Sequence, residues 1–203
     1  MSVIIERSFV QGSDEWFAAR AGSPGASSLS KIITSTGKPS TQRKAYLYQM
    51  AGEKILGKKE ESFKSAAMAR GTEMEPEARE CFCGISGLEV EEVAMCYADE
   101  LKLFHCSPDG LIVGKDSGLE IKNPIISTHI GYLDKGVLPT EYKLQVQGSM
   151  AVTGYSSWEF FSYYPGLQPL WITVERDEHL IKIILESLQE FCFDINQLVK
   201  KLK

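Results

Sequence analysis

The spacing of apolar residues along the chain predicts both helices and strands. In several stretches apolar positions recur every three to four residues with polar residues between them, which is typical of a helix with one buried face. Helices are therefore expected over residues 13–20, 26–33, 41–56, 63–82, 141–152 and 178–200. Pro76 falls inside the fourth of them and predicts a break near Glu75, because proline lacks the amide hydrogen that a helix interior needs.

Shorter apolar runs, separated by glycines, predict strands. They cover residues 89–93, 103–106, 111–113, 119–121, 157–163 and 170–174. Gly110, Gly114 and Gly118 divide the earlier runs, so we expect those strands to form a β-meander. The order of elements predicts an α/β fold with a mixed central β-sheet flanked by helices. We expect a single domain over residues 1–203, mainly helical to about residue 85 and built on the sheet over about 86–203.

Length and composition fit a globular protein. The chain has 203 residues, of which 43% are hydrophobic and 24% charged, enough to bury a core. No run approaches the roughly 18 apolar residues of a membrane-spanning helix, and the first residues are too few and too charged for a signal peptide. We therefore expect a cytoplasmic protein with no membrane partner. The five cysteines, an odd number, argue against a disulfide framework.

Charge is distributed unevenly. The formal net charge of −5 by itself argues against binding to nucleic acid. Residues 31–64, however, hold eight lysine and arginine residues against three glutamates, whereas residues 65–100 hold two basic residues against nine acidic ones. The first segment is suited to face phosphate and the second to hold cations, although a basic run is as often the solvated face of a helix.

Residues 107–122 contain the pattern of charged residues that indicates a functional site. Asp109 starts the first of two short strands that a glycine-rich turn joins, and Glu120 and Lys122 lie two apart on the second, so that their side chains share one face. Pairing of the strands would bring Asp109 close to Glu120. Two ionised carboxylates repel each other unless a cation lies between them. The sequence therefore predicts a metal site here.

Mg²⁺ suits this site, because it is a hard cation held by carboxylates, water and substrate phosphate. The Ile121 carbonyl is expected to supply a third oxygen, and Lys122 to hold or deprotonate the attacking water and oppose the charge that grows on phosphorus. An Asp-Gly turn or a Glu-x-Lys strand alone is more often structural. Apolar Leu119 and Ile121, however, place this strand beside the core, where a charged pair is costly without a function.

The same residues, with blocks around them, resemble the phage lambda exonuclease family of viral recombinases, a branch of the metal-dependent nuclease superfamily that includes many restriction endonucleases. The blocks that carry the resemblance are QGSDEWFAAR (11–20), RGTEME (70–75), CSPDG (106–110), LEIKNP (119–124), LQVQGSM (144–150) and VERDE (174–178). They occur in the family's order over almost the whole chain. The resemblance implies a restriction-endonuclease-like core with N-terminal helices that contact DNA.

The resemblance also implies an activity and its partners. Such proteins digest one strand of linear duplex DNA from its 5′ end, leave a 3′ overhang, form ring-shaped homotrimers and act with a single-strand annealing protein in phage or prophage recombination inside the bacterial host. We accordingly expect two Mg²⁺ ions per site, with Mn²⁺ as a substitute.

By motif, each predicted role falls on one position of this chain. Asp109 and Glu120 would bind the metal with Ile121, Lys122 would be catalytic, and Glu75 would lie in the same site. The positions expected to contact DNA are Arg20 at the 5′-terminal phosphate, Ser27, Ser107 and Gln145 at this and neighbouring phosphates, and Met68 between the separating strands. An arginine fork suits a terminal phosphate, and an apolar wedge suits strand separation.

Two other functions remain open. An endonuclease of the same superfamily would share Asp109, Glu120 and Lys122 but would need elements that read bases in the major groove. A DNA-end-binding module without catalysis would keep the fold and lose the chemistry.

Overall fold

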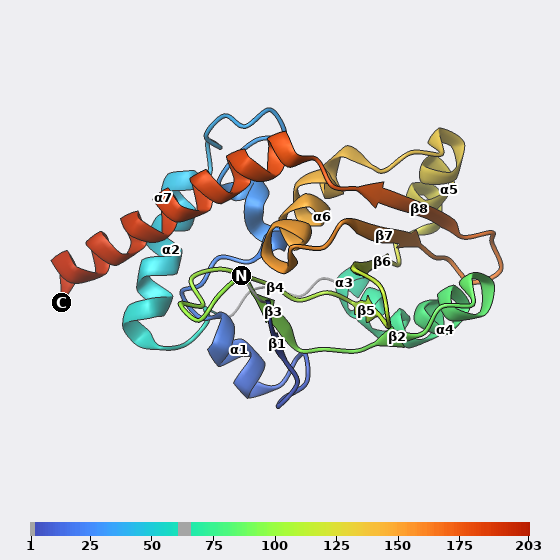
Figure 1. Ribbon diagram of the computed structural model, residues 1–203, viewed down its shortest axis with the longest axis horizontal. Coiled ribbons are helices and arrows are strands. Elements are labelled where there is room, and N and C mark those ends of the chain that lie inside the picture. The colour runs from blue at the N-terminus through green and yellow to red at the C-terminus, as the bar shows by residue number, and fades with distance from the viewer. Residues whose placement is uncertain (1–2, 61–65) are drawn as a thin grey trace.

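The computed structural model describes residues 3–60 and 66–203 (Figure 1). The helices are α1 (Asp14–Arg20), the 3₁₀ helix η1 (Ala26–Lys31), α2 (Arg43–Leu56), α3 (Ala66–Glu73), α4 (Glu75–Ser86), α5 (Ile126–Lys135), α6 (Thr140–Thr153) and α7 (Glu178–Leu202). The strands are β1 (Ile4–Glu6), β2 (Val90–Glu91), β3 (Met95–Tyr97), β4 (His105–Cys106), β5 (Gly110–Ile112), β6 (Ser117–Lys122), β7 (Ser157–Ser162) and β8 (Leu170–Glu175).

The central sheet has the order β2-β5-β6-β7-β8. Strands β6 and β7 are parallel, and the other neighbours are antiparallel, so the predicted mixed sheet flanked by helices is confirmed. A parallel pair needs a long crossover, which α5 and α6 provide between β6 and β7. Because side chains alternate along a strand, Leu119 and Ile121 pack with Phe82 of α4, whereas Glu120 projects to the other face, toward α6.

The predicted meander is wrong. Strand β4 does not join the central sheet but pairs with β3, with Cys96 opposite Cys106, and β3 pairs with β1 in a separate sheet of order β1-β3-β4. Neither β1 nor β3 was predicted, because each is only three residues long and its partner lies far away in sequence. The sheet joins the start of the chain to the segment that leads into Asp109.

Helix α5 was also missed. Its sequence contains Gly131 and several β-branched residues, which have low helix propensity. The helix is stabilised instead by tertiary packing, because His129 and Tyr132 lie three apart and are both buried. The predicted break near Glu75 is confirmed: α3 ends at Glu73, and Pro76 lies in the first turn of α4, where its missing N–H costs nothing.

A close contact holds η1 against α6. A Cβ atom at Gly148 would lie 2.2 Å from Cδ1 of Leu29, so a larger residue at this position would force the Leu29 side chain of η1 to move. The bridge between Gly25 and His105 then sets the start of η1 beside β4. In this way Gly148 helps to place the segment around Ser27 next to the segment that holds Ser107.

The long helix α7 runs beside α2 to the C-terminus (Figure 1). Its buried face, which includes Ile184, Leu188 and Phe191, completes the larger hydrophobic core. All five cysteines are free, as the sequence indicated. Among the described residues, no helix combines the length and the apolar character needed to cross a membrane. The division at about residue 85 within a single domain stays a prediction.

Candidate active site

Asp109 and Glu120 meet where β5 and β6 begin to separate. Asp109 lies directly before β5, and its backbone N–H donates to the Leu119 carbonyl at 3.0 Å. Its carboxylate Oδ2 accepts a hydrogen bond of 2.6 Å from the backbone N–H of Ile121. The hairpin therefore brings the two acidic residues together, as their spacing predicted.

The backbone of Ile121 faces the same place. The neighbouring Lys122 carbonyl accepts from Tyr163 N–H on the β7 side, at 2.8 Å. Backbone groups of successive strand residues point to opposite edges, so the Ile121 N–H and carbonyl both face the Asp109 edge, which β5 leaves unpaired beyond Leu119. The predicted third oxygen is thus on the correct side of β6.

Lys122 and Gln145 converge on one oxygen of Glu120. Both the Lys122 ammonium and the Gln145 side-chain amide donate to Oε1 of Glu120. Lys122 is also held from the side, since its Nζ lies 5.2 Å from the centroid of the Tyr142 ring. Tyr142 and Gln145 are three apart on α6, so one face of this helix contacts both Lys122 and Glu120 of β6. Gln145 is therefore placed against a carboxylate and not against open solvent.

Because Asp109, Glu120 and Lys122 are charged groups in a buried site, their pKa values are shifted. Burial raises the pKa of Glu120 to about 7, and the nearby charge of Asp109 adds to the effect while Lys122 opposes it. Burial likewise raises the pKa of Asp109. Burial works against the charge of Lys122, but Glu120 and Asp109 overcome this and raise its pKa above the ordinary value, so the amine is an ammonium at neutral pH.

Glu75 is linked to Asp109 by Arg79, a residue that the sequence analysis did not identify. The Arg79 guanidinium donates to Oε1 of Glu75 at 2.7 Å, to the Asp109 carbonyl at 3.0 Å and to Glu92 at 3.0 Å. Burial, followed by the charge of Asp109, raises the pKa of Glu75 to about 7. Arg79 thus links α4 to the start of β5. The i, i+4 spacing of Glu75 and Arg79 was a visible signal for this pair.

The donors fit a hard divalent cation. Oδ1 of Asp109 and Oε2 of Glu120 have no hydrogen-bond partner among the described residues, so one oxygen of each carboxylate remains for a ligand. Within residues 3–60 and 66–203, no three acidic, histidine or cysteine side chains form a metal-binding group. A metal bound here would have the Asp109 and Glu120 carboxylates and the Ile121 carbonyl as protein donors, with water or phosphate oxygens completing the shell.

Arg20 and Ser107 form a second feature, next to the first. Nη1 of Arg20 donates to Ser107 Oγ at 2.9 Å, and Nε1 of Trp16 donates to the same oxygen at 3.2 Å. Ser107 thus accepts twice, which leaves its own hydrogen to donate to a ligand. The Arg20 guanidinium lies 4.2 Å from the centroid of the Trp16 ring. The Nε atom of Arg20 is buried and has no hydrogen-bond partner. In the described part of the chain, Arg20 makes no ion pair. Burial lowers the pKa of Arg20 accordingly.

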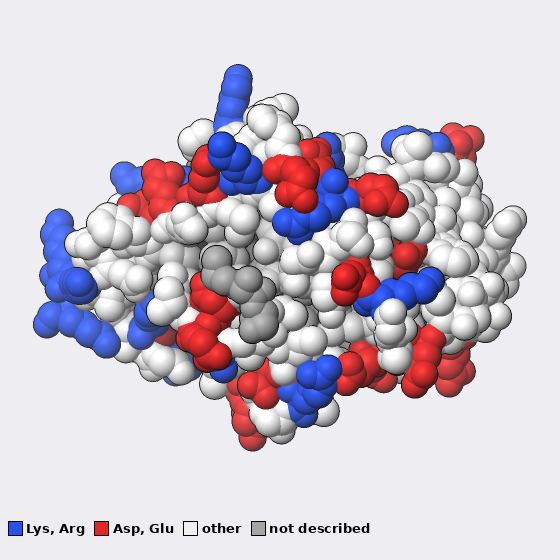
Figure 2. Space-filling model, in the orientation of Figure 1, with Lys and Arg blue, Asp and Glu red and all other residues white. Residues whose placement is uncertain are grey.

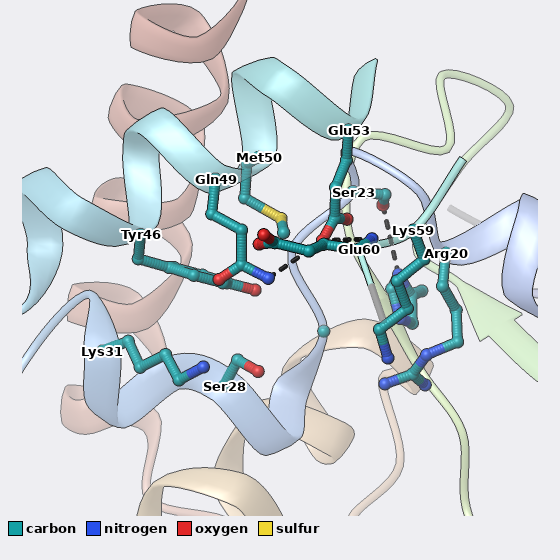
Figure 3. A pocket seen from close by; sticks show the side chains of 12 residues that line it. Arg20, Ser23, Ser28, Lys31, Tyr46, Gln49, Met50, Glu53, Lys59 and Glu60 are labelled. Atoms are coloured by element: carbon teal, nitrogen blue, oxygen red, sulfur yellow. Dashed lines mark hydrogen bonds between the residues drawn. The ribbon is translucent and has the colours of Figure 1, made fainter. Parts of the chain in front are cut away.

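Ser27 and Met68, the other residues predicted to contact DNA, have fewer described contacts. Ser27 is exposed in η1, and its neighbour Ser28 lines a cavity of about 120 Å³ that also includes Arg20 (Figure 3). Met68 belongs to α3, but its side chain lies outside the described residues. Basic and acidic side chains are interspersed on the face shown in Figure 2, so on this face charge is matched locally rather than over one broad basic surface.

Known proteins share both the sequence and the fold. A family model for the YqaJ-like viral recombinase domain matches residues 15–156. The crystal structure of an alkaline exonuclease from Laribacter hongkongensis is 33% identical, with a TM-score of 0.85 over 94% of this chain and 96% of that chain. The same exonuclease in complex with dAMP is 34% identical, with the same TM-score of 0.85.

A phage-related exonuclease from Haemophilus somnus 129PT, 17% identical, shares the fold with a TM-score of 0.69 over 89% of this chain and 96% of that chain. No curated protein sequence matches. The resemblance to lambda-type exonucleases is therefore confirmed: the chain belongs to the YqaJ-like viral recombinase family.

Proposed function

We propose that this protein is a Mg²⁺-dependent exonuclease that digests one strand of linear duplex DNA in the 5′-to-3′ direction and leaves a 3′ overhang for recombination by strand annealing. Support comes from the family, from the exonuclease names of its relatives, and from the adjacency of two features. Ser107, which Arg20 contacts, is two residues from Asp109 along the chain. A cationic side chain thus lies near a carboxylate pair, and this adjacency is the observation that carries the proposal.

In this proposal Asp109, directly before β5, and residues of β6, α6 and α4 each have a separate role. Asp109, Glu120 and the Ile121 carbonyl would hold Mg²⁺, which when bound would supply electrophilic activation of the phosphate. Lys122 orients the attacking water and opposes the growing negative charge, while Gln145 and Tyr142 hold Glu120 and Lys122 in place. Glu75, kept in position by Arg79, accepts the proton of the water. A second Mg²⁺, or Mn²⁺ in its place, stays a prediction.

In this proposal, the choice of the bond that breaks accounts for digestion in the 5′-to-3′ direction. Water oxygen bonds to phosphorus, and the bond from phosphorus to the 3′ oxygen of the terminal nucleotide breaks, so that oxygen leaves and takes up a proton from solvent. The released product is a 5′-mononucleotide, and the new strand end again carries a 5′-phosphate. Arg20 and Ser107 can bind each new end in turn, with Ser27 and Gln145 near the phosphates that follow and Met68 between the strands.

A digestion assay tests the direction and the substrate together. Linear duplexes blocked at the 5′ ends, blocked at the 3′ ends or left free are incubated with Mg²⁺, beside a covalently closed plasmid. We expect digestion of free and 3′-blocked duplex, no digestion of 5′-blocked duplex, and an intact plasmid. Cutting of the closed plasmid at the rate of linear DNA would instead support an endonuclease. Equal, negligible digestion by wild type and Asp109→Ala would support an end-binding module.

The assembly proposed for the family has its own test. We propose a homotrimeric ring around DNA that works with a single-strand annealing protein in the cytoplasm of a bacterial host. Light scattering after size-exclusion chromatography should give three times the chain mass of 22.6 kDa. A monomer at micromolar concentration would contradict the ring.

A further inference from the structure

Helix α3 is joined by two crossed hydrogen bonds to the segment that directly follows β6 (Figure 1). Nη1 of Arg70 donates to the Pro124 carbonyl at 3.1 Å. In the opposite direction, the side-chain amide of Asn123 donates to the Gly71 carbonyl at 2.9 Å. Asn123 and Pro124 come directly after Lys122 in the sequence. The two contacts therefore attach α3 to the chain next to the proposed catalytic lysine.

The Arg70 side chain also contacts the end of β7. The strands β6 and β7 are parallel and pair Lys122 with Ser162, so Pro124 and Tyr164 leave the sheet at the same edge. The Arg70 guanidinium lies 5.0 Å from the centroid of the Tyr164 ring, within the range of a cation–π attraction. One arginine thus fixes α3 against the ends of two central strands.

The backbone of Arg70 continues the link to Glu75. Its carbonyl accepts from the backbone N–H of Met74 at 3.1 Å, and Glu75 follows as the first residue of α4. This hydrogen bond spans the break between α3 and α4. A shift of α3 relative to β6 would therefore move Glu75 relative to Lys122.

The segment that contains Glu75 is attached to the sheet on both sides. After Glu75, Arg79 donates to the Asp109 carbonyl at 3.0 Å, directly before β5. Before Glu75, Arg70 donates to the Pro124 carbonyl, directly beyond β6. A helix pair attached at one point can pivot, whereas attachment on both sides fixes the position of the residue between them.

The Asn123 contact contributes more to placement than to stability. The Gly71 carbonyl can only accept, so the amide nitrogen of Asn123 must face it. Among the described residues, no donor reaches Oδ1 of Asn123, which is buried. A buried polar atom without a partner costs free energy and offsets what the other end of the amide contributes. The contact is therefore expected to set the position of α3 while adding little to the stability of the fold.

We propose that Arg70 and Asn123 are positioning residues for hydrolysis, which together hold Glu75 in place relative to Lys122 without touching the substrate. This inference rests on the proposed function, in which Glu75 accepts the proton of the attacking water. A small displacement of a reacting group slows a reaction strongly, because the barrier depends on its distance and direction. Since the two residues act on the reacting geometry and not on DNA capture, kcat should depend on them and DNA affinity should not.

The test measures single-turnover digestion of linear duplex at saturating protein with Mg²⁺, beside the Kd for the same duplex in EDTA. Arg70→Gln and Asn123→Asp should each lower the rate about tenfold or more while Kd stays nearly unchanged. Asn123→Asp keeps the shape of the side chain but replaces the donor by a carboxylate oxygen. Arg70→Lys should recover most of the rate, because an ammonium can donate to the Pro124 carbonyl and lie over the Tyr164 ring.

A double variant and a matched control make the test specific. The variant with both Arg70→Gln and Asn123→Asp should be about as slow as the slower single variant, because both changes break one link. Arg176 also donates to main-chain carbonyls, those of Met150 at 2.6 Å and Tyr155 at 3.2 Å, but it has no proposed part in catalysis. Arg176→Gln should therefore leave the rate of the folded protein unchanged.

The outcomes separate this inference from the function on which it rests. Wild-type rates in both single variants, rate losses that multiply in the double variant, or a rise in Kd in place of a fall in rate would each overturn it. A lower Tm with an unchanged rate in the folded fraction would show that the contacts are only structural. If the wild type shows no Mg²⁺-dependent digestion of linear duplex, the proposed function fails and this inference fails with it.

Discussion

At the scale of single residues, Lys122 is the side chain on which the proposed chemistry depends most. Its ammonium contacts Glu120 and the Tyr142 ring and keeps its charge despite burial, because two carboxylates face it. It is therefore suited to oppose negative charge and not to act as a free base at neutral pH. The proton acceptor must then be another group, and Glu75, with its raised pKa, is placed for that role.

Replacement of Lys122 tests this assignment. Lys122→Ala should lower kcat by at least about 100-fold, as expected for loss of a group that acts in the transition state. DNA binding in EDTA should stay within about threefold of wild type, because the proposed phosphate anchor is elsewhere. Single-turnover digestion and fluorescence anisotropy measure the two effects. A kcat within tenfold of wild type would contradict the role.

The raised pKa values predict how pH and Mg²⁺ act together on stability. Glu75 and Glu120 have pKa values of about 7 in the folded protein against an ordinary 4.5, so the folded state holds more protons than the unfolded chain between these values. The metal-free protein should therefore lose stability as pH rises through this range. Mg²⁺ relieves the repulsion between ionised carboxylates and should raise Tm more at pH 8 than at pH 6.

Differential scanning fluorimetry with and without Mg²⁺ at the two pH values measures this difference. Glu120→Gln removes one of the ionisable carboxylates and should reduce the difference between pH 8 and pH 6. An equal Mg²⁺ shift at both pH values in wild type would rule out the linkage to these acids.

At the scale of elements, two helices position the residues of the hairpin. Helix α6 contributes Tyr142 and Gln145 to Lys122 and Glu120, and α4 contributes Glu75 and Arg79. Arg79 has a special position because its guanidinium contacts both a side chain of its own helix and the carbonyl of Asp109. It fixes the distance between α4 and β5 without contacting substrate in the proposed mechanism.

Arg79→Gln should therefore reduce kcat about tenfold to 100-fold while KM for DNA changes little, since loss of a charged hydrogen bond costs about 1.5–3 kcal/mol. Arg79→Lys should recover only part of the activity, because one ammonium cannot reproduce the fork to three oxygens. Steady-state kinetics and a thermal melt of the same variant separate its effect on kcat from its effect on folding stability. A loss of folding stability with unchanged kcat in the folded fraction would show that Arg79 is only structural.

At the scale of the whole molecule, a net charge of −5 coexists with the cationic side chain of Arg20, which makes no ion pair in the described chain. Acidic and basic side chains are interspersed on the face shown in Figure 2. Because Arg20 is proposed to bind phosphate, DNA binding should weaken as salt is added. The slope of the binding constant against salt concentration, on logarithmic scales, is proportional to the number of phosphates that the protein neutralises.

We expect the logarithm of the binding constant to fall linearly with the logarithm of NaCl concentration. Arg20→Gln should reduce the slope by about one, because it removes one proposed phosphate contact. Lys58→Gln, at an exposed position, should not change it. Titrations of 5′-phosphorylated duplex at several salt concentrations measure the slopes, and equal slopes for wild type and Arg20→Gln would show that Arg20 does not contact phosphate.

The sequence by itself determined the geometry of the proposed metal site because that geometry is local. The period of two along a strand sets Glu120 and Lys122 on one face, and a short hairpin returns Asp109 to them, so few other arrangements are possible. The break at Pro76 and the long amphipathic α7 were predictable for the same reason. Short strands and α5 were not, because long-range packing stabilises them against weak local preference.

Only the tertiary structure decided which groups surround that hairpin. The contacts of Arg79 with Asp109, of Tyr142 with Lys122, and of Arg20 with Ser107 join segments that lie far apart in the sequence. Local periodicity tells which face of an element is apolar, but not which other element covers it. That choice follows from packing of the whole core, and here it selects the residues that surround the proposed catalytic groups and the residue proposed to bind the end of the DNA.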